Sequence, residues 1–264
     1  MINRSIHEKM TTNLAARRAK FRQLHESGCF IIPNPWNAGG ARRLQKLGFE
    51  AIASTSSGAA WALGREDGEM SLDEVLAHLK LLCEATDLPV NADFEAGFAD
   101  EPEGVAANVL RAIETGVAGL SIEDRTGREL YDSGLAIERM RAAREAIDSS
   151  GQDVLLVGRS EGFLIGETQL DRTIRRLRAY SEAGADCLYA PGIRDRGMIA
   201  EVVTAVAPKS VNVLLSTTDL SVPELAALGV RRVSVGGALA RATWERFDEV
   251  ASTLRDQGTL KPRA

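Results

Sequence analysis

Short apolar segments and amphipathic segments alternate along the whole of this chain. Eight times, a short apolar segment typical of a buried strand precedes a longer segment with helical spacing. In the segment QLDRTIRRLRAYSEAG, for example, Leu170, Ile174 and Leu177 recur at helical intervals. No linker rich in serine, proline or charge separates the units. The alternation predicts one α/β domain over residues 1–264, a closed (β/α)8 TIM barrel, rather than an open sheet.

The expected elements follow one another without a break. A helix at about 13–25 precedes the barrel, and the first two strands begin near Cys29 and Ala51. The last helix is expected from about Leu239 to Leu254. Because the active sites of such barrels lie in the loops after the strands, these loops hold the candidate residues. The other six strands are expected at 90–94, 119–123, 153–158, 187–190, 211–215 and 232–235.

Carboxylates stand at the ends of two successive strands. Asp93 and Glu95 are two positions apart, so on an extended strand their side chains point to one face. Glu123 and Asp124 end the next strand. Two close carboxylates repel unless a cation lies between them, and their oxygens are ligands for Mg²⁺ or Mn²⁺. A shared metal site is the first interpretation, and an acidic strand end that faces water is the second.

Two further strand ends carry groups that could bind an anion. Arg159 ends an apolar strand, and its planar guanidinium matches a carboxylate or phosphonate. The alternative for this arginine is an internal salt bridge to Glu161 or Glu123. The small-residue segment 56–59 could aim backbone N–H groups at an anion, or it could be a tight turn. The glycine pair at 236–237 allows a phosphate site or a turn into the last helix.

Composition excludes several classes of protein. The formal net charge of −5 argues against a nucleic acid partner. No apolar run approaches the length of a membrane span and no signal-peptide core is present, so a cytoplasmic location is expected. The cysteines at 29, 83 and 187 are odd in number and far apart, which indicates neither a disulfide framework nor a zinc cluster.

Six segments, taken together, resemble the isocitrate lyase and phosphoenolpyruvate mutase superfamily. They run in order along nearly the whole barrel: TSSGAAWALGREDGE, LPVNADFEAGF, GLSIED, LLVGRSEGF, YSEAGADCLYAPG and GVRRVSVGGALARA. The resemblance implies a Mg²⁺-dependent (β/α)8 enzyme that makes or breaks a C–C or P–C bond next to a 2-oxo acid or its enolate. It also implies a homo-oligomer, a tetramer or dimer, in which the last helix packs on a neighbouring subunit.

The resemblance also assigns roles around the expected metal. Asp93 resembles the direct metal ligand, and Glu95 and Glu123 resemble carboxylates that hold the metal through water. Asp67, in the segment GREDGE, resembles another acidic residue near the site. Mg²⁺, or Mn²⁺ in its place, is the implied cofactor.

A second set of roles concerns the substrate, a small carboxylate. Ser57, Gly58 and Ala59 resemble the loop that binds the substrate carboxylate through a hydroxyl and backbone N–H groups. Arg159 resembles the arginine that holds the other anionic group. The expected catalytic residues are therefore Arg159, Glu123 and Asp67.

The segment after the fourth strand departs from the family. Its sequence, DRTGRELYDSG, has neither the Cys-Gly-His motif of the isocitrate and methylisocitrate lyases nor the Lys-Thr-Asn-Ser-like loop of the phosphonate enzymes. This places the chain in a mutase-like branch. The expected function is Mg²⁺-dependent C–C cleavage, by decarboxylation or retro-aldol reaction, of a small 2-oxo or 2-hydroxy carboxylate such as oxaloacetate. The alternatives are a P–C mutase or hydrolase acting on phosphonopyruvate, and a silent carboxylate-binding member.

Retro-aldol cleavage would need a base. Tyr131, Glu161 or a metal-bound hydroxide could serve, and Arg125 and Arg128 could close over the substrate.

Overall fold

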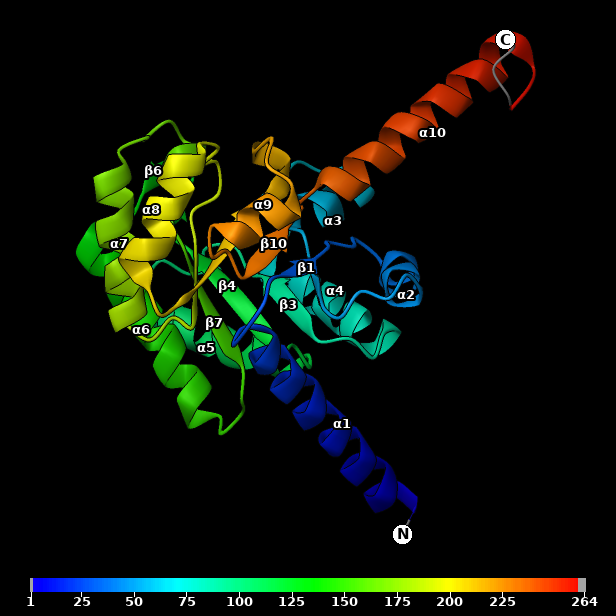
Figure 1. Ribbon diagram of the computed structural model, residues 1–264. Coiled ribbons are helices and arrows are strands. Elements are labelled where there is room, and N and C mark those ends of the chain that lie inside the picture. Colours follow the sequence, from blue (N-terminus) through cyan, green and yellow to red (C-terminus); the bar gives the residue numbers. More distant parts are fainter. Residues whose placement is uncertain (1, 261–264) are drawn as a thin grey trace.

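Eight parallel strands form a barrel in this computed structural model, which describes residues 2–260. Their order around the sheet is β1-β10-β9-β8-β7-β4-β3-β2 (Figure 1). Between β1 and β2, the Ala53 N–H donates to the Pro33 carbonyl at 3.1 Å and the Asn34 amide donates to the Ser54 carbonyl at 2.8 Å. The predicted single TIM barrel is therefore confirmed. The strands are β1 (Phe30–Ile32), β2 (Ile52–Ala53), β3 (Val90–Asp93), β4 (Gly119–Glu123), β7 (Leu155–Arg159), β8 (Cys187–Tyr189), β9 (Ser210–Leu214) and β10 (Arg232–Ser234).

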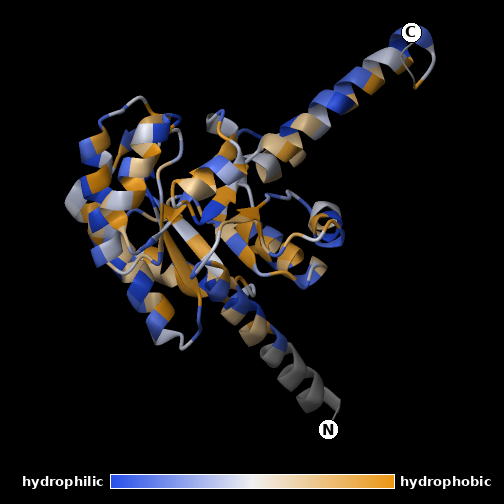
Figure 2. Ribbon diagram, viewed as in Figure 1, coloured by the Kyte–Doolittle hydropathy of each residue, from blue (hydrophilic) through white to orange (hydrophobic). Residues whose placement is uncertain are grey.

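Helices surround the strands and bury their apolar faces against them (Figures 1 and 2). Capping fixes where several of them begin. Ser71 accepts from the Glu74 N–H while the Glu74 carboxylate accepts from the Ser71 N–H, as the sequence pattern predicts. The helices are α1 (Ile2–Leu24), α2 (Ala38–Lys46), α3 (Ser56–Ala62), α4 (Leu72–Ala85), α5 (Pro102–Glu114), α6 (Ser133–Ser149), α7 (Leu170–Glu182), α8 (Arg196–Val206), α9 (Val222–Ala227) and α10 (Ala238–Gln257).

The carboxyl-terminal part of helix α1 closes the barrel at the amino-terminal ends of the strands, while its amino-terminal part projects away (Figure 1). Phe21 is fully buried there and packs with Phe30 and Leu155, the first residues of β1 and β7. Arg18 is buried beside it and donates to the carbonyls of Val117 and Ile113 at 3.0 and 3.2 Å. With this end sealed, a small molecule can enter only at the carboxyl ends of the strands.

Helix α10 projects away from the barrel (Figure 1). Ala240, near its start, is its only buried residue among those the structure describes. Trp244 and Phe247 remain 38% and 60% exposed although their rings contact each other at 5.8 Å. The helix thus carries an apolar face that its own barrel leaves uncovered.

The structure corrects three expectations about secondary structure. The helix expected at about 13–25 begins at Ile2. The small-residue segment after β2 is not a loop but the helix α3, because the Thr55 side chain caps it by accepting from the Gly58 N–H. The segment after β4 folds into a small hairpin of β5 (Arg125–Thr126) and β6 (Glu129–Leu130).

None of the described helices is long and apolar enough to span a membrane.

Candidate active site

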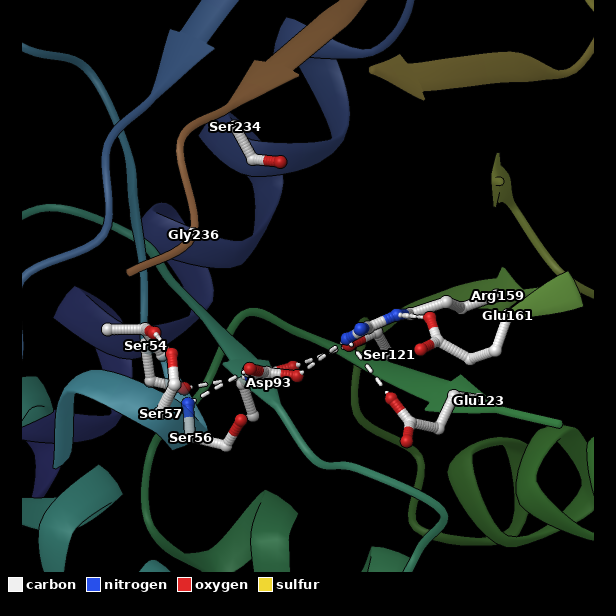
Figure 3. Close-up of polar contacts among 12 residues, drawn as sticks. Ser54, Ser56, Ser57, Asp93, Ser121, Glu123, Arg159, Glu161, Ser234 and Gly236 are labelled. Carbon is white, nitrogen blue, oxygen red and sulfur yellow. Dashed lines mark hydrogen bonds and ion pairs between the residues drawn. The ribbon is translucent and has the colours of Figure 1, made fainter. Parts of the chain in front are cut away.

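A polar cavity of about 150 Å³ lies at the carboxyl ends of the strands. Its walls come from the ends of all eight barrel strands and from the start of α3, and Figure 3 shows several of these residues. The strand register brings these ends together, because β3 pairs with β4 and β4 pairs with β7. The site therefore lies where the barrel architecture predicts it.

Asp93 lies at the centre of this site (Figure 3). Its Oδ2 accepts from the Ser56 N–H at 3.0 Å, and its Oδ1 lies 3.1 Å from Nη1 of Arg159. Its own backbone N–H donates to the Ser54 hydroxyl at 2.8 Å. These contacts from β2, α3 and β7 hold the carboxylate in one orientation.

Glu95 follows two residues later, in a strained backbone conformation. Its φ of 45° lies in the left-handed region, which is uncommon for residues other than glycine. Its Oε1 is buried without a hydrogen-bond partner. Burial, with the nearby charges of Asp93 and Asp67, raises the pKa of Glu95 to about 7. A buried carboxylate oxygen without a donor is the kind of atom that a cation satisfies.

Glu123 ends β4 beside these two acids. Its backbone N–H donates to the Glu95 carbonyl at 2.9 Å, and its Oε2 lies 3.2 Å from Nη1 of Arg159. Burial, together with the charges of Glu161 and Asp93, raises the pKa of Glu123, although Arg159 opposes the shift. A carboxyl group with a raised pKa can hold a proton near neutral pH.

Arg159 lies among the carboxylates rather than facing an open anion site. Its Nη1 contacts Asp93 and Glu123, and its Nε donates to Glu161. The internal salt-bridge alternative is therefore the arrangement in this structure. Burial alone would lower the pKa of Arg159, but Glu161, Glu123 and Asp93 raise it well above its usual value.

Negative charge exceeds positive charge around the cavity. Five acidic side chains lie in or beside it against three arginines, because Arg159 and Arg232 line it and Arg125 lies 3.9 Å from both Glu123 and Glu161. Among residues 2–260, however, no three acidic, histidine or cysteine side chains converge on one point as a metal site. The donor set therefore fits a cation that takes few protein oxygens directly. The five acids are Asp67, Asp93, Glu95, Glu123 and Glu161.

The structure revises the predicted carboxylate-binding segment. The Gly58 N–H donates to the Thr55 hydroxyl and the Ala59 N–H donates to the Thr55 carbonyl, so both groups are occupied within α3. Both residues are buried, and neither lines the cavity. Of the three predicted residues only Ser57 borders the cavity, with its hydroxyl 3.1 Å from that of Thr55.

The remaining candidates are divided between the cavity and its surroundings. Asp67 is exposed but lines the cavity. Arg128 is exposed in the hairpin turn. The Tyr131 hydroxyl donates to Asp100 at 2.5 Å, and the residue does not line the cavity. Glu161 does not line the cavity either, but it pairs with Arg159, which does, so it is the nearer of the two candidate protein bases for a retro-aldol reaction.

Asp124 has a supporting role that the sequence did not reveal. Its carboxylate is turned away from Glu123 and accepts from the Tyr180 hydroxyl at 2.6 Å, the Ser160 hydroxyl at 3.0 Å and Arg176 at 3.2 Å. It also accepts from the Glu161 backbone N–H at 2.8 Å. Asp124 thus holds the residues that follow β7, Ser160 and Glu161, in place from the side that faces α7.

Comparison with known proteins identifies the family to which the chain and its fold belong. The family model described as phosphoenolpyruvate phosphomutase matches residues 21–255. A Burkholderia cenocepacia protein described as a lyase/mutase superposes with a TM-score of 0.91 at 47% identity, covering 94% of this chain and 91% of that one. The 2-methylisocitrate lyase of Escherichia coli is 30% identical over 243 residues, 85% of this chain and 79% of that protein. The oxaloacetate decarboxylase of Bradyrhizobium diazoefficiens is 29% identical over 259 residues, 91% of this chain and 86% of that protein.

These relatives include lyases, and this chain is an enzyme of the same superfamily. The match covers nearly the whole barrel, including every strand end that forms the cavity. From its fold, its strand-end acids and this match, the chain belongs to the phosphoenolpyruvate phosphomutase family, within the superfamily of phosphoenolpyruvate mutases and isocitrate lyases.

Proposed function

We propose that this enzyme is a Mg²⁺-dependent lyase that cleaves a C–C bond in a small 2-oxo carboxylate, with oxaloacetate as the first candidate. The observation that carries the proposal is the excess of buried acid around Asp93, Glu95 and Glu123, with one oxygen of Glu95 unpartnered. Mg²⁺, or Mn²⁺, would be held directly by Asp93 and through water by Glu95 and Glu123. Such an ion supplies Lewis-acid stabilisation of an enolate.

Decarboxylation suits the residues that are present. The C3–C4 bond of oxaloacetate breaks, its electron pair remains as the enolate of pyruvate, and CO₂ leaves without a protein base. The enolate carbon must then take up a proton. Glu123 can hold that proton on Oε1, since its pKa is raised and its Oε2 faces Arg159. Ser57 lines the cavity and would orient a substrate carboxylate, and Arg125 would assist from its position beside Glu123 and Glu161.

The family resemblance keeps two other functions open to test. A P–C bond enzyme would consume phosphonopyruvate, and a silent member would bind carboxylates without product. NMR of purified protein with Mg²⁺ and a mixture of oxaloacetate, phosphonopyruvate, 2-methylisocitrate and dimethylmalate distinguishes these functions. We expect loss of oxaloacetate and appearance of pyruvate. Loss of phosphonopyruvate alone, or no loss above the protein-free rate, would contradict the proposal.

The raised pKa of Glu95 predicts that Mg²⁺ binding depends on pH. Below a pKa of about 7 this carboxyl is largely protonated in the metal-free protein, and metal binding must displace the proton. We expect Mg²⁺ affinity to fall about tenfold from pH 8 to pH 6. Calorimetry in buffers of different ionisation enthalpy would measure the affinity and the proton release. A Glu95→Gln variant should bind more weakly at pH 8 and show a flatter profile, and an unchanged profile would contradict this assignment.

We also propose that the protein is a homo-oligomer, dimer or tetramer, built through α10. The exposed Trp244 and Phe247 support this, because an isolated helix has nothing to cover such a pair. Light scattering after gel filtration should give a multiple of the 28.4 kDa chain mass. Replacing both residues by serine should yield a smaller species, whereas Leu47→Ser, at another exposed apolar position, should not. A monomeric wild-type protein would contradict the proposal.

A further inference from the structure

Polar side chains form the floor of the cavity, that is, the layer of the barrel interior just below Asp93, and this is unusual for a barrel of this kind. The interior layers of TIM barrels are filled mainly by branched aliphatic side chains. Here Asn91, Asn212 and Arg232 point inward from β3, β9 and β10, one layer below Asp93 and Ser234. All three are at least 97% buried. Burying a guanidinium in this layer costs free energy, because the charge loses its hydration. We therefore expect this side chain to have a function that offsets the cost.

Arg232 has no acidic partner among the described residues. Its Nε donates to the Asn212 side-chain oxygen at 3.1 Å and its Nη1 donates to the Asn91 side-chain oxygen at 3.2 Å. Both acceptors are neutral amides, which orient the guanidinium without neutralising it. Burial lowers the pKa of Arg232, although the charge of Asp93, one layer above, opposes the shift without contacting the guanidinium. By contrast, Arg231, the residue just before β10, is partly exposed and donates to the Gly28 carbonyl on the outside.

The same cavity that contains Asp93 and Arg159 reaches down to Arg232 and Asn91. Arg159 already contacts three carboxylates, so its charge is matched within the protein. Of the two arginines that line the cavity, Arg232 is the one that makes no ion pair among residues 2–260. An anion that entered the cavity would therefore find at its floor a guanidinium that no carboxylate contacts directly.

We propose that Arg232, oriented by Asn91 and Asn212, forms a subsite for one carboxylate of a dianionic substrate. The inference rests on the proposed function and deepens it, because it assigns which carboxylate binds where. A carboxylate beside a buried guanidinium is stabilised as an anion and is a poor source of neutral CO₂. The floor therefore holds the carboxylate that stays with the product. The carboxylate that leaves as CO₂ lies nearer the mouth of the cavity, at the carboxyl ends of the strands. Substrates with a single carboxylate leave either the floor or the mouth unfilled.

Oxalate, a small planar dianion, is a suitable probe of the floor. In the presence of Mg²⁺, we expect Arg232→Met to weaken oxalate binding at least about tenfold by calorimetry, in line with the loss of a charge-assisted hydrogen bond. The matched control, Arg231→Met at the neighbouring position, should bind oxalate as the wild type does. The melting temperature of Arg232→Met should be equal to or higher than that of the wild type, since the variant removes an unmatched buried charge.

A second variant tests the charge without removing the arginine. Asn212→Asp places a carboxylate against Nε of Arg232, which neutralises the floor and should weaken oxalate binding to a similar extent. Wild-type affinity in both variants, or no oxalate binding by the wild type, would overturn the subsite. If Arg232 only ties the strands together, Arg232→Met would lower the melting temperature and leave affinity unchanged, which also overturns it. Oxaloacetate turnover by the wild type tests the proposed function separately, so either inference can fail alone.

Discussion

Replacement of Asp93 by asparagine is expected to lower kcat/KM by about 10²- to 10³-fold or more. Asparagine keeps the shape and can still accept from the Ser56 N–H, but it removes the charge that would face the metal. Mg²⁺ affinity should fall in parallel. Steady-state kinetics and calorimetry on the same preparation would measure both losses, and circular dichroism would show an unchanged fold.

The matched control for this variant is Asp73→Asn. Asp73 also pairs with an arginine, Arg111, at 2.5 Å, but both side chains are exposed on the helix surface. Its loss should change neither kcat/KM nor the melting temperature appreciably. Full activity in the Asp93→Asn enzyme would show that Asp93 takes no part in the reaction. The acidic strand end would then have a structural role only.

Replacement of Arg159 by methionine is expected to have the second large effect. The variant leaves Asp93, Glu123 and Glu161 buried together without their shared cation. Removing one partner from a buried ion-pair cluster costs about 3–5 kcal/mol of folding free energy. Activity should also fall by about 10²-fold or more, because the carboxylates lose their arrangement. Denaturant titration and kinetics would measure the two effects.

The pH dependence of the Arg159→Met variant gives a sharper test. Without Arg159 the pKa of Glu123 rises further in the folded state, so the folded protein binds protons more readily than the unfolded chain. Stability therefore falls as pH rises, and the variant should melt at a higher temperature at pH 5.5 than at pH 7.5.

Two further variants separate stability from activity. A second substitution, Glu161→Gln, should restore much of the stability of Arg159→Met but not its activity. Arg196→Met, which breaks an exposed pair with Glu224, should behave as the wild type. Full activity in Arg159→Met would contradict the role of this cluster.

The barrel itself could be predicted from the sequence because short, mainly apolar strands alternate with helices, several of which begin at a side-chain cap. Ser71 and Glu74 illustrate this, since their spacing alone defines a capping box that the structure confirms. The acids of the site could be located for a related reason. Asp93 and Glu123 stand at strand ends, and in a parallel barrel all strand ends meet on one face.

The orientation of individual side chains at those ends could not be predicted. Glu123 and Asp124 are adjacent, and only the packing of α7 against β7 decides that Asp124 turns away toward Arg176 and Tyr180. The helix α3 was missed because its small residues resemble a turn, although Thr55 is a good N-cap. Arg232 and Asn91 lie two residues before Ser234 and Asp93, so alternation along the strand could have placed them in the barrel interior.

The measurement that tests the proposed chemistry most directly is pyruvate formation from oxaloacetate at saturating Mg²⁺, corrected for the metal-catalysed rate without protein. The wild-type enzyme should form pyruvate and CO₂ in equal amounts, well above that background, and Asp93→Asn should return to it. A wild-type rate equal to the background, with turnover of phosphonopyruvate under the same conditions, would contradict C–C cleavage and identify the site as one for P–C chemistry.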